Sequence, residues 1–73
     1  VLFNNEQWGA EKKNHVDFYS RRYQGVELVN PSWAQVAKSF GCEGITVDKV
    51  SDVGAALQQS VKNQAEGKTT VLE

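Results

Sequence analysis

Methionine is absent from this sequence of 73 residues, and cysteine and proline each occur only once. The single cysteine, Cys42, excludes an internal disulfide, and we expect it to be a buried small side chain rather than a reactive thiol. The net charge of −1 offers no basic surface for nucleic acid. No apolar run approaches the roughly 20 residues that span a bilayer, and no signal-peptide pattern is present. We therefore expect a cytoplasmic protein with no nucleic-acid and no membrane partner.

Short β-prone runs alternate with helical patterns along the chain, which is long enough for one small domain at residues 1–73. Strands are expected at Val1–Phe3, Ile45–Val47 and Thr69–Leu72. Helices are expected at Glu11–Tyr23, from Asn30 and Pro31 to Gly41, and from Ser51 or Asp52 to Gly67. The order strand-helix-helix-strand-helix-strand predicts an α/β fold, with three short parallel strands joined by crossover helices.

The predicted helices carry apolar residues at helical spacing. Val16, Tyr19 and Tyr23 form the stripe of the first helix, and its other face is charged. Asn30 is a favoured N-cap and Pro31 a favoured first residue for the second helix. The spacing of the second and third helices predicts a core built from Trp33, Phe40, Leu57 and Val61.

Polar residues follow each predicted strand. Asn4 and Asn5 come after the first, Asp48 after the second and Glu73 after the third. In parallel α/β sheets, ligands bind outside the carboxyl ends of the strands. Amide and backbone carbonyl oxygens suit hard cations such as Mg²⁺ or Ca²⁺. The sequence therefore predicts a candidate cation site at Asn4 and Asn5.

The same residues resemble a known family. Val1–Gly9, reading V-L-F-N-N-E-Q-W-G, resembles the end of the thiamin-diphosphate-binding motif, which runs from Gly-Asp-Gly to a strand ending in Asn-Asn. Ala10–Tyr19 resembles the sulfoacetaldehyde acetyltransferase family within the acetolactate synthase superfamily. Ser32–Gly41, Gly44–Val47 and Val53–Leu57 are similar to the C-terminal pattern of that superfamily. The resemblance covers essentially the whole chain, and it implies the C-terminal half of a thiamin-diphosphate-binding domain.

This resemblance implies a site for thiamin diphosphate and Mg²⁺ in the parent enzyme. Asn5, through its side-chain oxygen, and Gln7, through its main-chain oxygen, would be metal ligands. Asn4 would orient the turn, Gly9 would allow close approach of the backbone to the cofactor, and Trp8 would wall the pocket or take a core or interface role. The third ligand, the Asp of Gly-Asp-Gly, is not among these residues, and neither is the family's glutamate that promotes ylid formation. We expect no catalytic residue here, and neither cofactor binding nor turnover by this chain alone.

The resemblance also implies a reaction. The parent enzyme would convert sulfoacetaldehyde and phosphate to acetyl phosphate and sulfite, a step of taurine metabolism. An alternative is acetolactate synthase or another 2-oxo-acid lyase, although acetolactate synthases usually have Gln-Gly-Met where Trp8-Gly9-Ala10 stands.

A second alternative is a non-catalytic α/β fragment that associates with itself. The chain starts on an apolar run without an initiator methionine, which favours a piece of a larger protein over an intact domain released from a tag. Half a domain would leave sheet edges and an apolar face open, and such surfaces invite pairing. We therefore expect a homo-oligomer, most simply a dimer, with the remainder of the parent enzyme as the other partner.

Two charged features have more than one interpretation. His15, the sole histidine, is either an acid/base or substrate-binding group or a solvated or capping residue beside Asn14 and Asp17. The second feature is a group of four cations. One interpretation is that they bind phosphate or sulfonate; the other is that they form a solvated helix face or a subunit contact. The four are Lys12, Lys13, Arg21 and Arg22.

Overall fold

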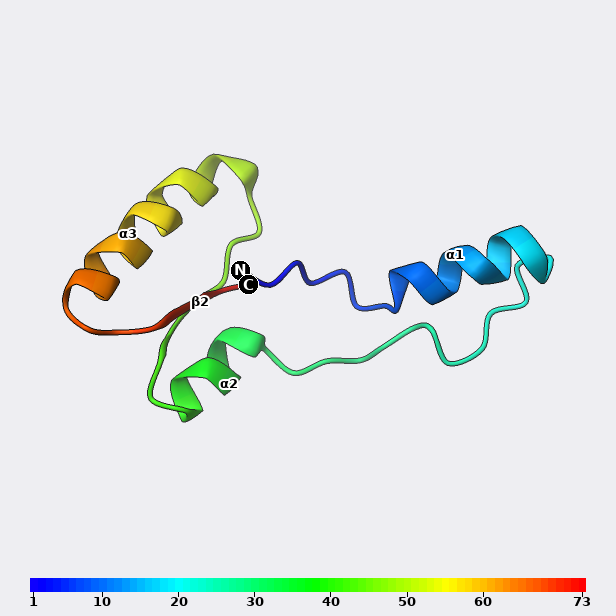
Figure 1. The fold of residues 1–73 in the computed structure, drawn as a ribbon, viewed down its shortest axis with the longest axis horizontal. Helices are drawn as coiled ribbons and strands as arrows, with labels where there is room; N and C mark the ends of the chain where they lie inside the picture. The colour runs from blue at the N-terminus through cyan, green and yellow to red at the C-terminus, as the bar shows by residue number, and fades with distance from the viewer.

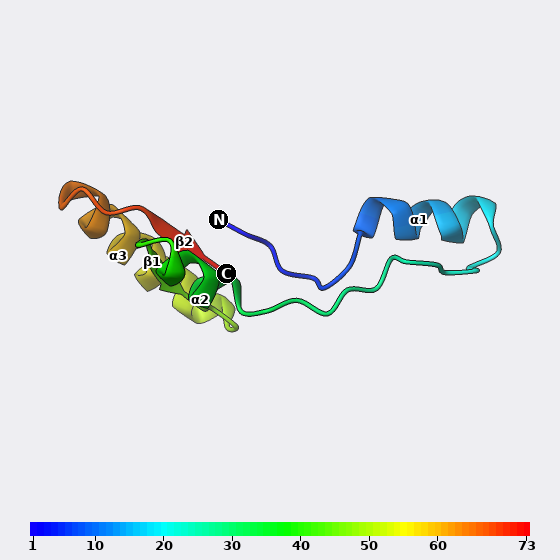
Figure 2. The ribbon, with the colours of Figure 1, turned by 90° about the horizontal axis from the view of Figure 1, so that it is seen from below.

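The computed structural model describes residues 1–73, which form an elongated molecule with extents of 50 × 26 × 16 Å. Helix α1 (Gly9–Phe18) lies at one end and the other helices and the strands lie at the opposite end (Figure 1). Two extended segments connect these ends. We call residues 6–30 the arm and the rest of the chain the body; Figure 2 shows the arm projecting from the body.

The body is a small α/β unit. Its elements are α2 (Trp33–Ser39), β1 (Glu43–Ile45), the 3₁₀ turn η1 (Val50–Asp52), α3 (Val53–Ala65) and β2 (Thr70–Leu72). The strands pair in parallel with Gly44 opposite Val71, as expected when a helix forms the crossover between them. Helices α2 and α3 lie on opposite sides of the strands (Figure 1). The predicted α/β class is therefore confirmed for the body.

The sheet has two strands, so the prediction of three was wrong. The predicted first strand, Val1–Phe3, makes one ladder-like contact, in which the Leu2 N–H donates to the Leu72 carbonyl at 2.8 Å. The backbone N–H and C=O of Glu73 both face β1. Because the backbone groups of neighbouring strand residues face opposite edges, the N–H and C=O of Leu72 face away from β1. Val1–Phe3 thus follows the free edge of β2, but one hydrogen bond does not make it a strand.

The third helix starts after Asp52, as predicted, but the end of the first helix and the start of the second differ from the prediction. Helix α1 ends at Phe18, not Tyr23, because Ser20 and Arg21 take left-handed conformations with φ of 52° and 60°. Helix α2 begins at Trp33 with Ser32 as its N-cap, so the prediction of a start at Asn30 and Pro31 was also wrong.

The buried core is small and consists mainly of alanine. Its apolar members are Val26, Ala34, Ala37, Ala56 and Leu72. The larger predicted core residues lie elsewhere: Phe40 is 82% exposed, Val61 67% and Leu57 44%, while Trp33 is half-buried. Two short strands offer too little surface to cover these side chains, and this is why the predicted core was wrong. Cys42 is half-buried. None of the helices has the length and apolar character that a membrane-spanning helix requires.

Candidate functional site

Asn4 and Asn5 form two consecutive turns closed by their own side chains. Asn4 Oδ1 accepts from the Glu6 N–H and Asn5 Oδ1 accepts from the Gln7 N–H, each at 3.2 Å. Such turns are the usual reason that asparagine ends an extended segment. Glu6 has a φ of 53°, so the chain enters the arm through a left-handed residue. The turn leaves a second lone pair on Asn5 Oδ1 for another partner.

Glu73 holds this turn against the body. Glu73 Oε1 accepts from Asn4 Nδ2 at 3.0 Å, and Oε2 accepts from the Ala34 N–H at 3.1 Å and from the Ser32 hydroxyl at 3.3 Å. The Ala34 N–H lies in the first turn of α2 and is the main cause of a lowered pKa of the Glu73 carboxyl; the Trp33 backbone and the Asn4 and Ser32 side chains lower the pKa further. Glu73 is therefore an ionised carboxylate at neutral pH.

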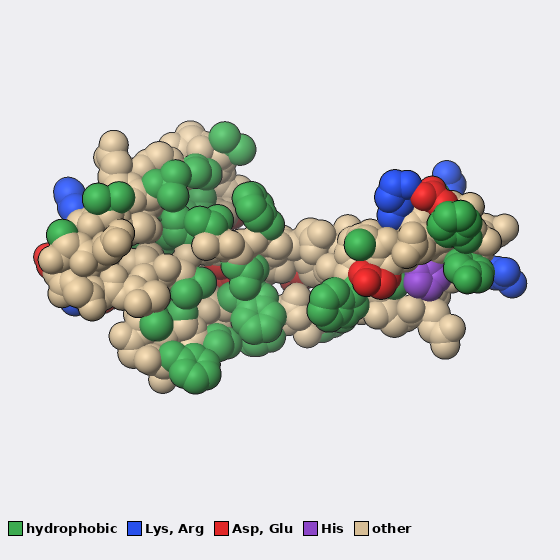
Figure 3. Space-filling view, in the orientation of Figure 1, with side chains coloured by type: hydrophobic (Ala, Val, Ile, Leu, Met, Phe, Trp, Pro, Cys, Tyr) green, Lys and Arg blue, Asp and Glu red, His purple; other side chains and the backbone are tan.

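An apolar cleft of about 750 Å³ opens beside the turn. Its lining brings together the four polar residues that follow the predicted strands, namely Asn4, Asn5, Asp48 and Glu73. Apolar walls come from Val1–Phe3 on one side and from α3, through Val53, Ala56 and Leu57, on the other. Figure 3 shows apolar side chains gathered on this part of the body. The structure thus brings these polar residues together in the lining of one apolar cleft, as expected from their positions after the predicted strands.

Three of the predicted site residues lie beyond the cleft, in the first part of the arm. Gln7 pairs with Glu27 in an antiparallel bridge, and Trp8 is the N-cap of α1, with its side chain 57% exposed. Gly9 stays next to Asn5, since a Cβ on Gly9 would lie 3.4 Å from Asn5 Nδ2. Gln7, through its N–H bond to Asn5 Oδ1, and Gly9 therefore stay in contact with the Asn-Asn turn, whereas Trp8 is exposed.

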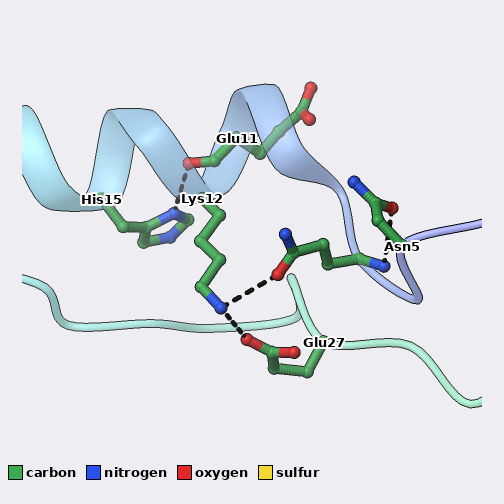
Figure 4. A network of polar contacts seen from close by, with 6 residues as sticks. Asn5, Glu11, Lys12, His15 and Glu27 are labelled. Atoms are coloured by element: carbon green, nitrogen blue, oxygen red, sulfur yellow. Dashed lines mark hydrogen bonds and ion pairs between the residues drawn. The ribbon is translucent and has the colours of Figure 1, made fainter.

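Lys12 ties the two sides of the arm together, a role that the sequence analysis did not identify. Its Nζ donates to Gln7 Oε1 at 2.9 Å and forms an ion pair with Glu27 (Figure 4). The same Nζ lies 5.1 Å from the centre of the Tyr23 ring. The hydrogen bond to Glu27 raises the pKa of Lys12, so this cation keeps its charge. Lys13 pairs with Asp17 one helical turn away. Two of the four candidate anion-binding cations thus already have acidic partners.

His15 belongs to the arm and is half-buried. Its Nδ1 lies 2.7 Å from the Glu11 carbonyl, so a neutral imidazole carries its proton on Nδ1 and donates to that oxygen (Figure 4). The imidazole is tilted against the rings of Tyr19 and Tyr23, with centroids 6.1 and 6.3 Å away. These contacts favour the structural interpretation of His15 over the acid/base one.

Two oxygen atoms of the turn fit one part of the ligand set of a Mg²⁺–diphosphate site. No group of three or more His, Cys, Asp or Glu side chains is placed to hold a metal ion. Asn5 Oδ1 has a lone pair to spare, and the Gln7 carbonyl oxygen accepts no backbone hydrogen bond. Mg²⁺ binds through few protein oxygens and completes its shell with phosphate and water. Gly9 lies directly beside this turn, since a Cβ at position 9 would be in van der Waals contact with Asn5.

Comparison with known proteins assigns the family. The whole chain, residues 1–73, matches the model of the thiamine pyrophosphate enzyme, C-terminal TPP binding domain. The chain belongs to this family. The resemblance predicted from the Asn-Asn turn and its continuation is therefore confirmed, and the cofactor of the family is thiamine pyrophosphate, which is another name for thiamin diphosphate.

Individual relatives agree with this assignment. The chain is 55% identical to sulfoacetaldehyde acetyltransferase of Alcaligenes xylosoxydans xylosoxydans and 51% identical to that of Castellaniella defragrans, in both cases over its full length. It is 28% identical over 64 residues, 88% of its length, to the mitochondrial acetolactate synthase catalytic subunit of Saccharomyces cerevisiae, of which it covers 9%. The chain spans 12% of the length of the two acetyltransferases. No solved structure matches it.

Proposed function

We propose that this chain is part of a Mg²⁺-dependent sulfoacetaldehyde acetyltransferase, which uses thiamin diphosphate to convert sulfoacetaldehyde and phosphate to acetyl phosphate and sulfite. The support is the 55% identity to a protein of that name over the full chain, against 28% to an acetolactate synthase. Trp8-Gly9-Ala10 also differs from the Gln-Gly-Met that is usual in acetolactate synthases. Such an enzyme would act in taurine metabolism, and we place it in the cytoplasm.

In this proposal the chain binds and orients, and it supplies no acid, base or nucleophile. Thiamin diphosphate, when bound, supplies the carbanion chemistry of the reaction. Asn5 Oδ1 and the Gln7 main-chain oxygen would be ligands of Mg²⁺, and Asn4 would fix the turn between them. Gly9 would keep the space beside Asn5 open, and the exposed Trp8 would wall the cofactor pocket. The remaining metal ligand would come from outside these residues.

A hybrid enzyme tests the proposal directly. Residues 1–73 replace the corresponding segment of the Alcaligenes acetyltransferase, to which they align over their whole length. We expect the hybrid to release sulfite from sulfoacetaldehyde in the presence of phosphate, thiamin diphosphate and Mg²⁺. A matched Asn5→Ala hybrid should lose Mg²⁺-dependent turnover because it lacks one metal ligand. A hybrid that folds, binds the cofactor and forms acetolactate from pyruvate instead would support the lyase alternative.

The chain by itself should bind the cofactor too weakly to measure. It contributes two neutral oxygen ligands, whereas tight Mg²⁺–diphosphate binding needs further oxygen ligands and phosphate-binding groups. Calorimetric titration of the chain with thiamin diphosphate and Mg²⁺ measures this directly. A micromolar dissociation constant would contradict the expectation.

The exposed apolar surface supports a second candidate, self-association without catalysis. Phe3 is 92% exposed and Val1 81% exposed, and both line the open apolar cleft. The segment Val1–Phe3 also has an outer edge without a neighbouring strand. Apolar walls and a free edge together favour a second copy of the chain as the occupant. We propose a dimer through this face.

Sedimentation velocity at micromolar concentration tests the dimer. We expect a dimer that Phe3→Ser shifts toward monomer, since this change removes an aromatic ring from the cleft. The control is Val50→Ser, which alters an equally exposed residue, 91% exposed, away from the cleft lining. A stable monomer of the unchanged chain would remove the proposal.

A further inference from the structure

We propose that Glu73 is a positioning residue for the metal and diphosphate site, because it fixes the Asn4–Asn5 turn relative to α2 and the sheet. The inference rests on the proposed function in one respect, namely that Asn5 is a ligand of Mg²⁺. It goes beyond that function by assigning a role to a residue that lies 69 positions away from Asn4 in sequence.

The backbone of Glu73 is held firmly by the sheet. The Glu73 N–H donates to the Ile45 carbonyl at 2.8 Å, and the Glu73 carbonyl accepts from the Val47 N–H at 2.6 Å. The Glu73 side chain therefore starts from a fixed point just beyond β2. Its carboxylate reaches donors on three different segments: Asn4 of the turn, Ser32 and Ala34 of α2 and its cap, and Thr46 after β1.

This set of donors shows why Glu73 positions the site and does not bind the metal itself. Oε1 accepts from Asn4 Nδ2, and Oε2 accepts from the Ala34 N–H, the Ser32 hydroxyl and, at 3.4 Å, the Thr46 hydroxyl. A carboxylate that accepts this many hydrogen bonds has few lone pairs left for a cation. The same bonds occupy the first turn of α2, so its N–H groups do not face a phosphate.

Asn4 carries the effect of Glu73 to Asn5. The Asn4 side chain uses both ends of its amide, since Nδ2 donates to Glu73 while Oδ1 accepts from the Glu6 N–H. This orients the amide and places Glu6 in the left-handed conformation from which the chain turns into the arm. Asn5 lies between Asn4 and Glu6, and its own side chain bonds only within the turn. Glu73 therefore acts on Asn5 through the neighbouring Asn4, which fixes the turn in which Asn5 Oδ1 lies.

The geometry predicts a defined effect on metal affinity. Loss of a direct hydrogen-bond partner of a metal ligand typically weakens metal binding by about 10–100-fold, and Glu73 acts one residue further out, through Asn4, so we expect the lower end of that range. We expect Glu73→Gln in the hybrid enzyme to raise the dissociation constant of Mg²⁺ about tenfold, measured by calorimetry with thiamin diphosphate present. At saturating Mg²⁺ we expect kcat to stay close to that of the unchanged hybrid, because no group that touches the reacting atoms is altered. Glu43→Gln is the matched control, since its carboxylate pairs with Lys68 away from the turn.

Asn4→Ala provides a second, milder variant. It removes the bond to Glu73 and the bond from the Glu6 N–H, but leaves the bonds of Glu73 to α2 in place, so it decides the question if Glu73→Gln fails to fold. We expect Mg²⁺ binding to weaken at least as much as in Glu73→Gln, and the double variant to weaken it less than the sum of the two single changes, because both break the bond between Asn4 and Glu73. Unchanged Mg²⁺ affinity in a folded Glu73→Gln or Asn4→Ala hybrid would overturn the proposal, as would fully additive effects.

A readout that needs no cofactor separates this inference from the proposed function. In the 73-residue chain, the side-chain amide signals of Asn4 should shift in an NMR titration as the Glu73 carboxyl gains its proton, and Glu73→Gln should abolish the shift. If the unchanged hybrid neither binds Mg²⁺ nor turns over its substrate, the proposed function fails. The titration still tests whether Asn4 is bonded to Glu73. Asn4 signals that do not respond to the protonation of Glu73 would overturn it.

Discussion

Gly44 of β1 faces the backbone of Ala34 in α2 so closely that a Cβ at position 44 would lie 2.1 Å from the Ala34 carbonyl oxygen. Helix α2 therefore packs directly on the strand, with no side chain between them. This contact sets the position of the first turn of α2, and with it the Ala34 N–H that binds Glu73. A glycine in β1 thus connects the packing of the body to the candidate site.

Gly44→Ala should destabilise the body strongly. The new methyl group meets backbone atoms, which cannot rotate away, so the helix must shift; overpacking of this kind costs about 3 kcal/mol. Urea unfolding followed by circular dichroism measures the change. Gly54→Ala is the control, because nothing lies within 4 Å of its added Cβ and alanine is the better helix former. We expect that variant to be more stable by about 0.5–1 kcal/mol. Equal stabilities of the two variants would contradict the close contact.

Ser32→Ala should weaken α2, whereas Asn30→Ala should not. The Ser32 hydroxyl accepts from the Gln35 N–H at 3.3 Å and donates to Glu73, and loss of an N-cap costs about 1 kcal/mol. Asn30 lies two residues before the cap and outside the helix. Helix content and the free energy of unfolding decide between the two caps. A larger loss in Asn30→Ala than in Ser32→Ala would restore the start predicted from the sequence.

Lys12→Met should loosen the arm. Hydrogen exchange of the Trp8 and Leu28 amides, which bond across the arm to Val26 and Glu6, should speed up because the ion pair with Glu27 is lost. Lys13→Met is the matched control, since it alters only a pair within α1. Exchange rates that match in the two variants would exclude a special role for Lys12.

The charge of Lys12 also predicts a dependence on pH. The folded protein raises the pKa of Lys12 above its ordinary value of 10.5. The contribution of the ion pair between Lys12 and Glu27 to folding stability is therefore fully present below pH 10.5. It is lost as the pH rises through the raised pKa. Fluorescence of Trp8, at the base of the arm, should therefore change in strongly alkaline solution at a lower pH in Glu27→Gln than in the unchanged chain.

Glu73 should govern stability in acid. Its pKa is lowered from the ordinary value of 4.5, so its contribution is present above pH 4.5 and is lost as the pH falls through the lowered pKa. Glu73→Gln removes this titrating group and should flatten the decline in stability over that acid range. Urea midpoints measured at several pH values below 4.5 test the expectation. Parallel declines in both proteins would show that other carboxyl groups are responsible.

The sequence predicted the order of elements in the body well, because glycines mark the helix ends. Gly41 and Gly67 follow α2 and α3 with φ of 83° and 79°, conformations that favour glycine. The end of α1 was not predictable in this way, since Ser20 and Arg21 take left-handed conformations without such a signal.

The core was mispredicted for a different reason. Periodicity identifies an apolar face, but it does not say how much sheet is present to cover that face. With two strands of three residues, Phe40 and Val61 have nothing to pack on. Alanines on the inner faces of α2 and α3 are buried instead.

For the candidate site, the sequence predicted which residues lie together but not what holds them. Asn4, Asn5, Asp48 and Glu73 line one cleft, as expected from their places after the predicted strands, although Val1–Phe3 is not a strand in the structure. The bond between Asn4 and Glu73 joins positions 69 residues apart, and that between Lys12 and Glu27 joins positions 15 apart. No periodicity or motif encodes pairings of this range, so only the folded chain reveals them.

The long separation between Asn4 and Glu73 has a consequence for synthesis. During translation, Asn4 leaves the ribosome 69 residues before its partner Glu73. The turn that carries Asn5 cannot be fixed until β2 has paired with β1, because Glu73 lies just beyond that pair. Contacts between residues this distant are slow to form, because the entropy of closing the long loop is lost first. The candidate site is therefore assembled last, and a nascent chain that stops short of Glu73 holds Asn5 in a turn without an anchor.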